Sequence, residues 1–335
     1  MTATMSDIAN KCGVSLTTVA RALKNKGEIS QETKKRILKV AEDLDYTANI
    51  PARILAGGKS NIIGLVVADN SNPYYARLIR GIEDTAKQNG YGVILYNTDE
   101  TMELELSSHA MLNKYRVDGL LITSIISGAE PLENLKLRNT PFVLLNRYIE
   151  GYPADSVRSD NRLGGYLVTS HLCERGHKAI MHITGSEKIS SVRERIDGYK
   201  KALAEHGIAF DPNFVQQCDL KLEGGYICAL NALEHLTPKP TAIFAYSDLL
   251  ATGVLKALKE KGIRVPEDIA IAGYDNIDFS PFLEPPLTTV DQFAYRIGKE
   301  GMEILIEKMN FDPGKNWENR ELIIKPELII RHSSM

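Results

Sequence analysis

From Ile62 onward, short β-rich runs alternate with amphipathic helical stretches, and this alternation limits the possible folds more than any other feature. The β-rich runs end at Asp69, Asn97, Ser124, Asn146, Thr184, Asp219, Ser247 and Asp275. The helical stretches that follow them include Tyr75–Asn89, Arg162–Arg175, Arg193–His206 and Leu249–Lys261. The pattern predicts an α/β fold of right-handed βαβ units, with parallel sheets and helices on both faces. Because about 275 residues are long for one such sheet, we expect two lobes, with strands near Thr288–Gln292 and Leu322–Arg331 passing between them.

The first 46 residues carry no strand pattern and predict three short helices instead. These helices are expected over residues 6–11, 15–23 and 30–44. Thr4 and Asp7 have the spacing of a capping box before the first helix, and Ser15 and Ser30 are good N-caps for the other two. Residues 6–25 have the size of a helix-turn-helix, with Gly13 in the turn.

The charged residues divide unevenly between this head and the rest of the chain. Residues 1–60 hold 10 Lys and Arg against 6 Asp and Glu, a net charge of +4. Residues 61–335 hold the remaining 30 and 37, so the total of −3 is the sum of +4 and −7. A basic head on an acidic body is typical of a chain that contacts a polyanion with one end only.

The predicted second helix places different side chains on its two faces. Leu16, Thr17, Thr18 and Arg21 lie on the outward side, while Val14, Val19 and Leu23 face inward. An arginine can pair with both acceptors of guanine, and a threonine methyl can contact the methyl group of thymine. The spacing therefore favours DNA binding, although a three-helix bundle that binds protein is the alternative.

Short motifs occur along the whole chain in the order of one known family. The head and the linker contain Asp7-Ile8-Ala9, the run from Gly13 to Leu23, Tyr46-Thr47-Ala48-Asn49 and Ala52-Arg53-Ile54-Leu55. The rest contains Asn72-Pro73-Tyr74-Tyr75, Gly176-His177, Arg195-Ile196-Asp197-Gly198-Tyr199, Gly273-Tyr274-Asp275, the run from Pro285 to Val290 and Ile330-Arg331. In these motifs the chain resembles the lac repressor (LacI/GalR) family of transcriptional regulators.

The resemblance implies a three-helix helix-turn-helix head and a two-lobed, periplasmic-binding-protein-like (type I) body with parallel sheets. The expected domains are a DNA-binding domain over residues 1–46, a hinge over 47–60, and an effector-binding and dimerisation body over 61–335. The first lobe is expected over about 61–161 and 291–322, and the second over about 162–290 and 323–335. Within the hinge, Pro51 and Gly57 exclude a long regular element.

For DNA binding, the resemblance assigns roles to particular residues. The implied contact residues are Ser15, Leu16, Thr17, Thr18, Arg21, Asn25, Asn49, Ala52 and Leu55. Leu55 matches a leucine that enters the minor groove and kinks the duplex. Ala20 and Ile50-Pro51 depart from the family pattern. The alternative roles are local ones: Leu55 covers an apolar edge of the body, Asn49 caps a helix, and Arg21 is a solvated charge.

A second site is expected beyond the carboxyl ends of the strands, where open α/β sheets bind ligands. The resemblance implies eight effector-contact residues, namely Tyr74, Tyr75, Asn146, Arg195, Leu220, Ser247, Asp275 and Gln292. Carboxylate, amide and guanidinium groups with aromatic faces suit a sugar. Leu220 and Ser247 stand where some relatives carry an aromatic residue and Asn. Asp248 is as consistent with a helix N-cap as with a ligand contact, and Arg195 and Asp275 are able to pair with each other.

Other functional classes find little support in the sequence. Gly58-Lys59-Ser60 lacks the earlier glycine of a phosphate loop, because position 53 is Arg53, and it precedes a strand. His171, Cys173, His177 and His182 do not have the spacing of a metal site, and we expect no cofactor. The four cysteines are scattered, the apolar runs are too short to span a bilayer, and no secretory signal is visible. We therefore expect a cytoplasmic protein.

The leading hypothesis is an allosteric transcriptional regulator, expected to be a repressor. A homodimer would bind a near-palindromic operator, and a small molecule, a sugar or sugar derivative, would act from the cleft between the lobes. One alternative is a solute-binding protein of a transport system, which the first 60 residues oppose. Another is an enzyme acting on a sugar or nucleotide, for which no catalytic constellation is present.

Overall fold

The structure is a computed structural model that describes residues 3–23, 29–46, 59–124, 128–312 and 314–335. The chain divides into two compact units, Met1–Ser60 and Asn61–Met335, which we call the head and the body. The head contains α1 (Met5–Cys12), α2 (Leu16–Leu23) and α3 (Gln31–Asp43). These helices confirm the three expected from the sequence, with ends that differ by one residue.

The head is held together by a small apolar core and by caps close in sequence. Ile8, Val19 and Ile37, one from each helix, are completely buried against one another. The Thr4 hydroxyl accepts a hydrogen bond from the Asp7 backbone at 3.3 Å, and the Asp7 carboxylate accepts one from the Thr4 backbone at 2.8 Å. This reciprocal pair confirms the predicted capping box.

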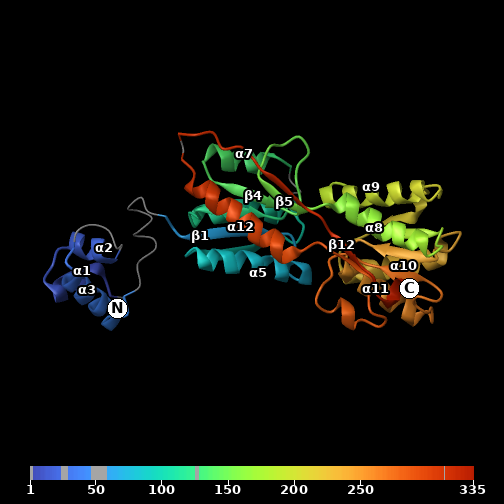
Figure 1. Ribbon diagram of the computed structural model, residues 1–335, viewed down its shortest axis with the longest axis horizontal. Coiled ribbons are helices and arrows are strands. Elements are labelled where there is room, and N and C mark those ends of the chain that lie inside the picture. The colour runs from blue at the N-terminus through green and yellow to red at the C-terminus, as the bar shows by residue number, and fades with distance from the viewer. Residues whose placement is uncertain (1–2, 24–28, 47–58, 125–127, 313) are drawn as a thin grey trace. The chain divides into compact units, whose positions relative to one another are not determined.

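The first lobe of the body is a six-stranded parallel sheet with the order β11-β5-β4-β3-β1-β2. Its strands are β1 (Ile62–Val67), β2 (Gly92–Asn97), β3 (Gly119–Ile122), β4 (Phe142–Leu145), β5 (Ser156–Ser159) and β11 (Glu321–Ile324). The helices α5 (Pro73–Gln88) and α12 (Ala294–Asn310) share a core with one face, and α6 (Met102–Lys114) and α7 (Glu130–Leu137) share one with the other. Figure 1 shows α5 and α12 side by side along the sheet.

The second lobe is a four-stranded parallel sheet with the order β7-β6-β8-β9. Its strands are β6 (Ile180–Thr184), β7 (Val215–Gln217), β8 (Ala242–Ala245) and β9 (Ala270–Ala272). One face is covered by α8 (Asn161–Glu174) and α9 (Ser190–Glu205), and the other by α10 (Leu222–His235) and α11 (Asp248–Glu260). Three short 3-10 helices, Pro212–Phe214, Ser280–Phe282 and His332–Ser334, complete the described elements.

The later strands pass between the lobes, as expected. β10 (Thr289–Asp291) pairs antiparallel with β12 (Glu327–Ile329), and both strands belong to the chain segments that join the two sheets. β11 stays in the first sheet through Ile324, two residues beyond the predicted passage at 322, because Ile324 is buried in the core of that lobe. The strand Ser156–Ser159 was not predicted from the sequence.

Close packing of α8 against α9 depends on glycine. A Cβ atom on Gly165 would lie 2.4 Å from the backbone oxygen of Arg195, and one on Gly198 would lie 2.1 Å from that of Arg162. No side chain fits at either position unless the helix backbones separate. The glycines therefore set the distance between α8, which begins at Asn161, and the part of α9 that carries Arg195.

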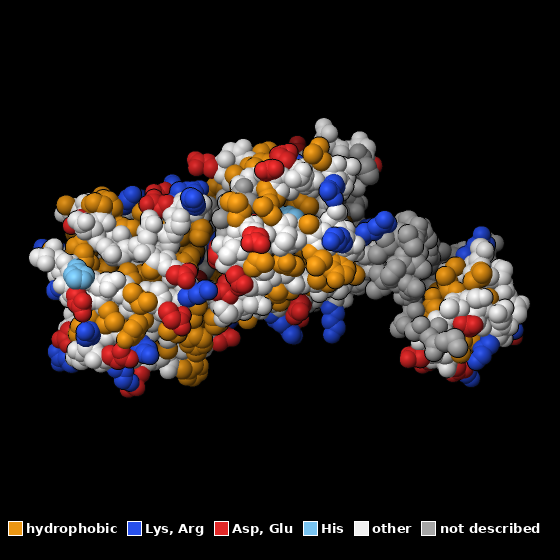
Figure 2. Space-filling view, turned by 180° about the vertical axis from the view of Figure 1, so that it is seen from behind, with side chains coloured by type: hydrophobic (Ala, Val, Ile, Leu, Met, Phe, Trp, Pro, Cys, Tyr) orange, Lys and Arg blue, Asp and Glu red, His pale blue; other side chains and the backbone are white. Residues whose placement is uncertain are grey.

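Both signs of charge are spread over the visible face of the body in Figure 2. In the described ranges, no helix is long and apolar enough to cross a membrane.

Candidate DNA-binding face and effector cavity

The outward side of α2 carries the residues predicted to contact DNA. Ser15, Leu16, Thr17 and Arg21 are exposed and Thr18 is half-buried. Leu16 keeps 53% of its surface exposed, which is a high value for a leucine beside an intact apolar core. We call the surface formed by these five residues the α2 face.

The opposite side of α2 fixes the orientation of this face. Val19 and Ala22 are buried between α1 and α3. The Ser15 hydroxyl accepts a hydrogen bond from the Thr18 backbone at 3.1 Å and so caps the helix. Arg36 of α3 donates to the Cys12 carbonyl at 3.0 Å, which ties the third helix to the turn before α2.

Four other predicted DNA contacts lie outside the described residues. They are Asn25, Asn49, Ala52 and Leu55. Their contacts with DNA stay predictions.

The eight predicted effector residues all line one cavity at the carboxyl ends of the strands. This cavity, which we call the main cavity, has a volume of about 330 Å³. Its lining comes from both lobes: Tyr74, Tyr75 and Asn146 belong to the first, and Arg195, Leu220, Ser247 and Asp275 to the second. Gln292 follows β10, on a segment between the two lobes.

Arg195 is tightly held in the wall of the main cavity. It is 3% exposed, and its guanidinium lies 4.2 Å from the ring centroid of Tyr246 and 3.5 Å from that of Tyr274. Its Nε donates to the Asn161 side chain at 3.0 Å and its Nη1 to the Tyr246 carbonyl at 2.5 Å. Aromatic faces and hydrogen bonds therefore fix the orientation of the guanidinium.

Asp275 lies near Arg195 but receives its hydrogen bond from another residue. Gln292 Nε2 donates to its carboxylate at 2.5 Å. Burial raises the pKa of Asp275 well above its ordinary value, and the nearby positive charge of Arg195 lowers this pKa only in part. The direct Arg195–Asp275 pair considered from the sequence is therefore not the arrangement seen among the described contacts.

The first-lobe side of the main cavity is a tyrosine and asparagine cluster. The Tyr74 hydroxyl donates to Asn146 Oδ1 at 2.6 Å, and the rings of Tyr74 and Tyr75 meet edge to face at 5.3 Å. Asn146 has φ +64°, a left-handed conformation that asparagine tolerates better than most residues. The Asn72 side chain caps α5 by accepting from the Tyr74 backbone at 3.0 Å.

Ser247 and Asp248 have roles that the sequence left open. Ser247 lines the main cavity and also caps α11, because its hydroxyl accepts from the Leu250 backbone at 3.2 Å. Asp248 is outside the described lining and is not the cap. It is completely buried, and accepts from Thr289 at 2.5 Å and from Ser280 at 2.6 Å. Burial raises the pKa of Asp248 to about 6.

Several lining residues escaped the sequence prediction. They include Glu100, Asn161, Ser191 and Tyr246. Glu100 binds Arg147 through two hydrogen bonds, of 2.9 and 2.5 Å, and Arg147 follows the fourth strand end noted in the sequence. The signal for Glu100 is its place after the strand that ends at Asn97, but nothing local indicates its partner.

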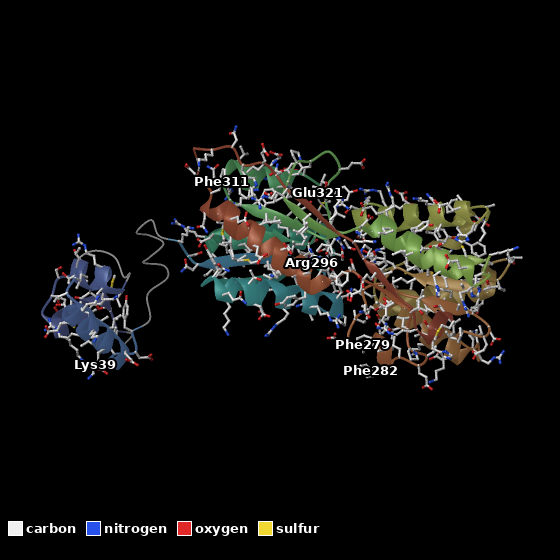
Figure 3. All side chains as sticks on the ribbon, in the orientation of Figure 1. Lys39, Phe279, Phe282, Arg296, Phe311 and Glu321 are labelled. Atoms are coloured by element: carbon white, nitrogen blue, oxygen red, sulfur yellow. The ribbon has the colours of Figure 1, made fainter. Side chains whose placement is uncertain are left out.

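Asn161 connects the main cavity to a buried ionic network. Its amide nitrogen donates to Glu194 at 3.2 Å, and Glu194 accepts from Arg158 at 3.0 Å and from the Tyr148 hydroxyl at 3.1 Å. Arg158 also binds Glu321 of β11 at 2.6 Å. Figure 3 shows Glu321 at the passage between the lobes. The network therefore joins the wall of the main cavity to that passage.

The residues considered as metal ligands have other partners. His171 binds the Ser334 hydroxyl at 2.8 Å, and His182 donates from Nδ1 to the Phe244 carbonyl at 2.9 Å. Among the described residues, no group of three or more His, Cys, Asp or Glu side chains is arranged to hold a metal ion.

Comparison with known families gives two matches. Residues 4–49 match the family described as bacterial regulatory proteins, lacI family. Residues 169–334 match a periplasmic binding protein-like domain.

Individual relatives match over nearly the whole chain. The HTH-type transcriptional repressor PurR of Photobacterium profundum is 35% identical over 332 residues, which cover 99% of this chain and 98% of the relative. The solved structure of the lac repressor dimer bound to operator and the anti-inducer ONPF is 25% identical, with a TM-score of 0.87 and complete coverage of both chains. A LacI family transcriptional regulator from Enterococcus faecium with bound ribose is 33% identical, with a TM-score of 0.71, and covers 82% of this chain and 98% of its own.

Proposed function

This chain belongs to the lacI family of bacterial regulatory proteins, and from that premise we propose that it represses transcription as an operator-bound homodimer controlled by a small carbohydrate. It is a DNA-binding transcriptional regulator, and its family consists of regulators and not of enzymes. The head distinguishes it from a solute-binding protein, which only the body resembles. Operator DNA lies in the cytoplasm, where we place the protein.

The α2 face supports the proposed operator contacts. Of its three hydroxyl groups, those at Thr17 and Thr18 suit phosphates or base edges. Arg21 suits guanine, and the exposed Leu16 suits the methyl group of thymine. The basic head supplies the attraction to phosphate, and the acidic body is repelled by it.

Exposed apolar side chains support the homodimer. In the first lobe, Met102, Leu106 and Met111 of α6 are all more than one-third exposed. In the second lobe, Ile227 is 55% and Phe282 85% exposed, and Figure 3 shows Phe282 at the edge of that lobe. Apolar surface of this kind is typical of an interface between subunits.

The composition of the main cavity supports a carbohydrate effector. Hydrogen-bonding groups of both kinds converge there, with donors on Arg195, acceptors on Asp275 and both on Asn146. The rings of Tyr74, Tyr75 and Tyr246 supply the faces against which the C–H side of a sugar packs. The observation that carries the proposal is that all eight effector residues expected from the family line this one cavity.

The proposal is tested by separating the two activities. The body alone, residues 61–335, should lose specific operator binding and keep ligand binding, measured by DNA selection and by thermal shift against sugars and nucleobases. Asp275→Ala should weaken effector binding by at least about tenfold while the unliganded protein still binds DNA. If purine bases stabilise the protein and no sugar does, the assignment of a carbohydrate effector is wrong. If the body without the head binds operator as tightly as the full chain, the assignment of DNA binding to the head is wrong.

Arg21→Ala tests the α2 face with a matched control. It should lower operator affinity about tenfold or more and relax the preference for guanine at one position. Lys39→Ala removes the same charge from α3, where Figure 3 shows the side chain pointing outward. Lys39→Ala should lower DNA affinity only slightly and by the same factor for all DNA sequences. If the two variants lose the same operator affinity, Arg21 contributes only its positive charge and does not contact a particular base.

A further inference from the structure

A second, smaller cavity adjoins the main cavity. It has a volume of about 210 Å³, and we call it the side chamber. Glu100, Asp219 and Leu220 line both spaces, and the side chamber alone is lined by Ser186, Lys188, Ile189 and Cys218. The two spaces therefore meet at a junction formed by two carboxylates and one apolar side chain.

The wall of the side chamber includes a fixed apolar surface. Ile189 is 9% exposed and belongs to a small core cluster against which Leu220 packs. Leu220 lies directly over Gly185 at the end of β6, where a Cβ atom would come within 2.9 Å of its side chain. Leu220 is therefore held at the junction, and its exposed part and that of Ile189 offer methyl groups to a ligand.

The polar groups at the junction accept hydrogen bonds. Glu100 is held in place by the two hydrogen bonds from Arg147, and Asp219 is exposed at the opposite loop. Carboxylates accept hydrogen bonds from hydroxyl groups and repel a phosphate at the same distance. The side chamber is also lined by one cation, Lys188, which the two carboxylates outnumber. A ligand that passes the junction should therefore be rich in hydroxyl groups and carry no net negative charge.

We infer that the effector is a neutral disaccharide, with one ring in the main cavity and the second ring in the side chamber. This inference rests on the proposed function, because it takes the main cavity as a sugar site. Hydroxyl groups near the glycosidic bond donate to Glu100 and Asp219, and the C–H face of the second ring packs on Ile189 and Leu220. A monosaccharide fills only the main cavity and leaves the apolar wall of the side chamber in water.

The full-length protein is titrated calorimetrically with cellobiose, maltose, lactose, sucrose and trehalose, with glucose, galactose and fructose, and with glucose 6-phosphate. At least one disaccharide should bind about tenfold or more tightly than its constituent monosaccharides and than the phosphate. A monosaccharide that binds as tightly as every disaccharide, or tighter binding of glucose 6-phosphate, overturns the inference.

A pair of variants locates the second ring. Ser186 is exposed at the rim of the side chamber, so Ser186→Trp fills the chamber without disturbing the core. It should lower the affinity of the preferred disaccharide about tenfold and leave monosaccharide affinity within about twofold. Glu187→Trp places the same ring on the same loop outside the described lining and should change neither affinity.

The outcomes separate this inference from the proposed function. If a monosaccharide binds and alters operator affinity while Ser186→Trp has no selective effect, the carbohydrate function stands and the disaccharide is excluded. If no sugar binds and a purine base does, the carbohydrate function itself fails, and the disaccharide fails with it.

Discussion

The α2 face of the head and the main cavity of the body are built in opposite ways. The α2 face occupies one short helix and its cap, within residues 15–21. The main cavity collects strand ends and helix starts between residues 69 and 292. A surface made by one helix can be recognised from local periodicity, whereas a cavity made by a sheet edge depends on contacts that only the fold brings together.

The two regions should therefore respond differently to substitution. A change in the α2 face or in a helix cap acts on neighbours within a few residues, and a change in the main cavity acts on groups far away in the sequence. The following predictions test that difference in order of decreasing effect.

Gly165→Val should give the largest effect. The new side chain would meet the backbone of Arg195 in α9, so the helices must separate and move Arg195 away from Asn161. We expect the free energy of unfolding to fall by about 3 kcal/mol and the effector affinity to fall by more than about tenfold. Chemical denaturation and ligand titration measure the two losses.

The control for this variant is Ala204→Val on the exposed side of α9. It adds a β-branched residue to the same pair of helices without a backbone contact and should cost less than about 1 kcal/mol. Equal losses in the two variants would show that the glycine contact does not position the site.

His182→Phe should give the next largest effect, measured as a change in how the free energy of unfolding depends on pH. His182 is completely buried, and burial lowers its pKa to about 4 from the ordinary 6.5. Between pH 6.5 and pH 4 the imidazole of His182 is therefore protonated in the unfolded chain and neutral in the folded chain. The stability that neutral His182 contributes is fully present above pH 6.5 and is lost as the pH falls through 4. Between pH 7 and pH 5 the wild type should lose about 2 kcal/mol more than the variant.

Denaturation at the two pH values checks this prediction, with His235→Phe as control. The His235 side chain is 78% exposed, so its replacement should leave the pH dependence as it is in the wild type. Because residues 1–60 contain no histidine, the loss should belong to the body. If the head also loses stability between pH 7 and pH 5, the loss does not belong to the body alone.

Thr4→Ala and Thr101→Ala should give the smallest effects. Each removes a side-chain cap, from α1 in the head and from α6 in the body, at a cost of about 1 kcal/mol. Hydrogen exchange should accelerate about fivefold in the capped helix alone. Effector affinity should stay unchanged in Thr4→Ala; if it changes, the cap in the head acts on the body and the two units are not independent.

The sequence predicted most of the fold because its signals are local. The Thr4–Asp7 capping box, the outward side of α2 and the eight strand ends all depend on residues close in the chain. The family resemblance added the eight lining residues, which periodicity alone does not identify. The contacts of these residues with DNA and effector stay predictions.

The strand Ser156–Ser159 shows why other features were not predictable. Three of its four residues are polar, and a buried strand is expected to be apolar. Arg158 is buried there because Glu194 and Glu321 neutralise it, and these partners lie 36 and 163 residues away. Glu100 escaped prediction for the same reason, since its partner Arg147 is 47 residues further on.

The position of α12 has a consequence for biosynthesis. The sheet of the second lobe comes from one continuous segment, residues 180–272, but the first lobe needs α12 and β11 from residues 294–324. During translation, Leu78 and Ile82 of α5 are made early and find their partners on α12 only when nearly the whole chain has left the ribosome. The lobe that begins first is therefore completed last, and a nascent chain that stops before α12 exposes one apolar face of a half-finished sheet.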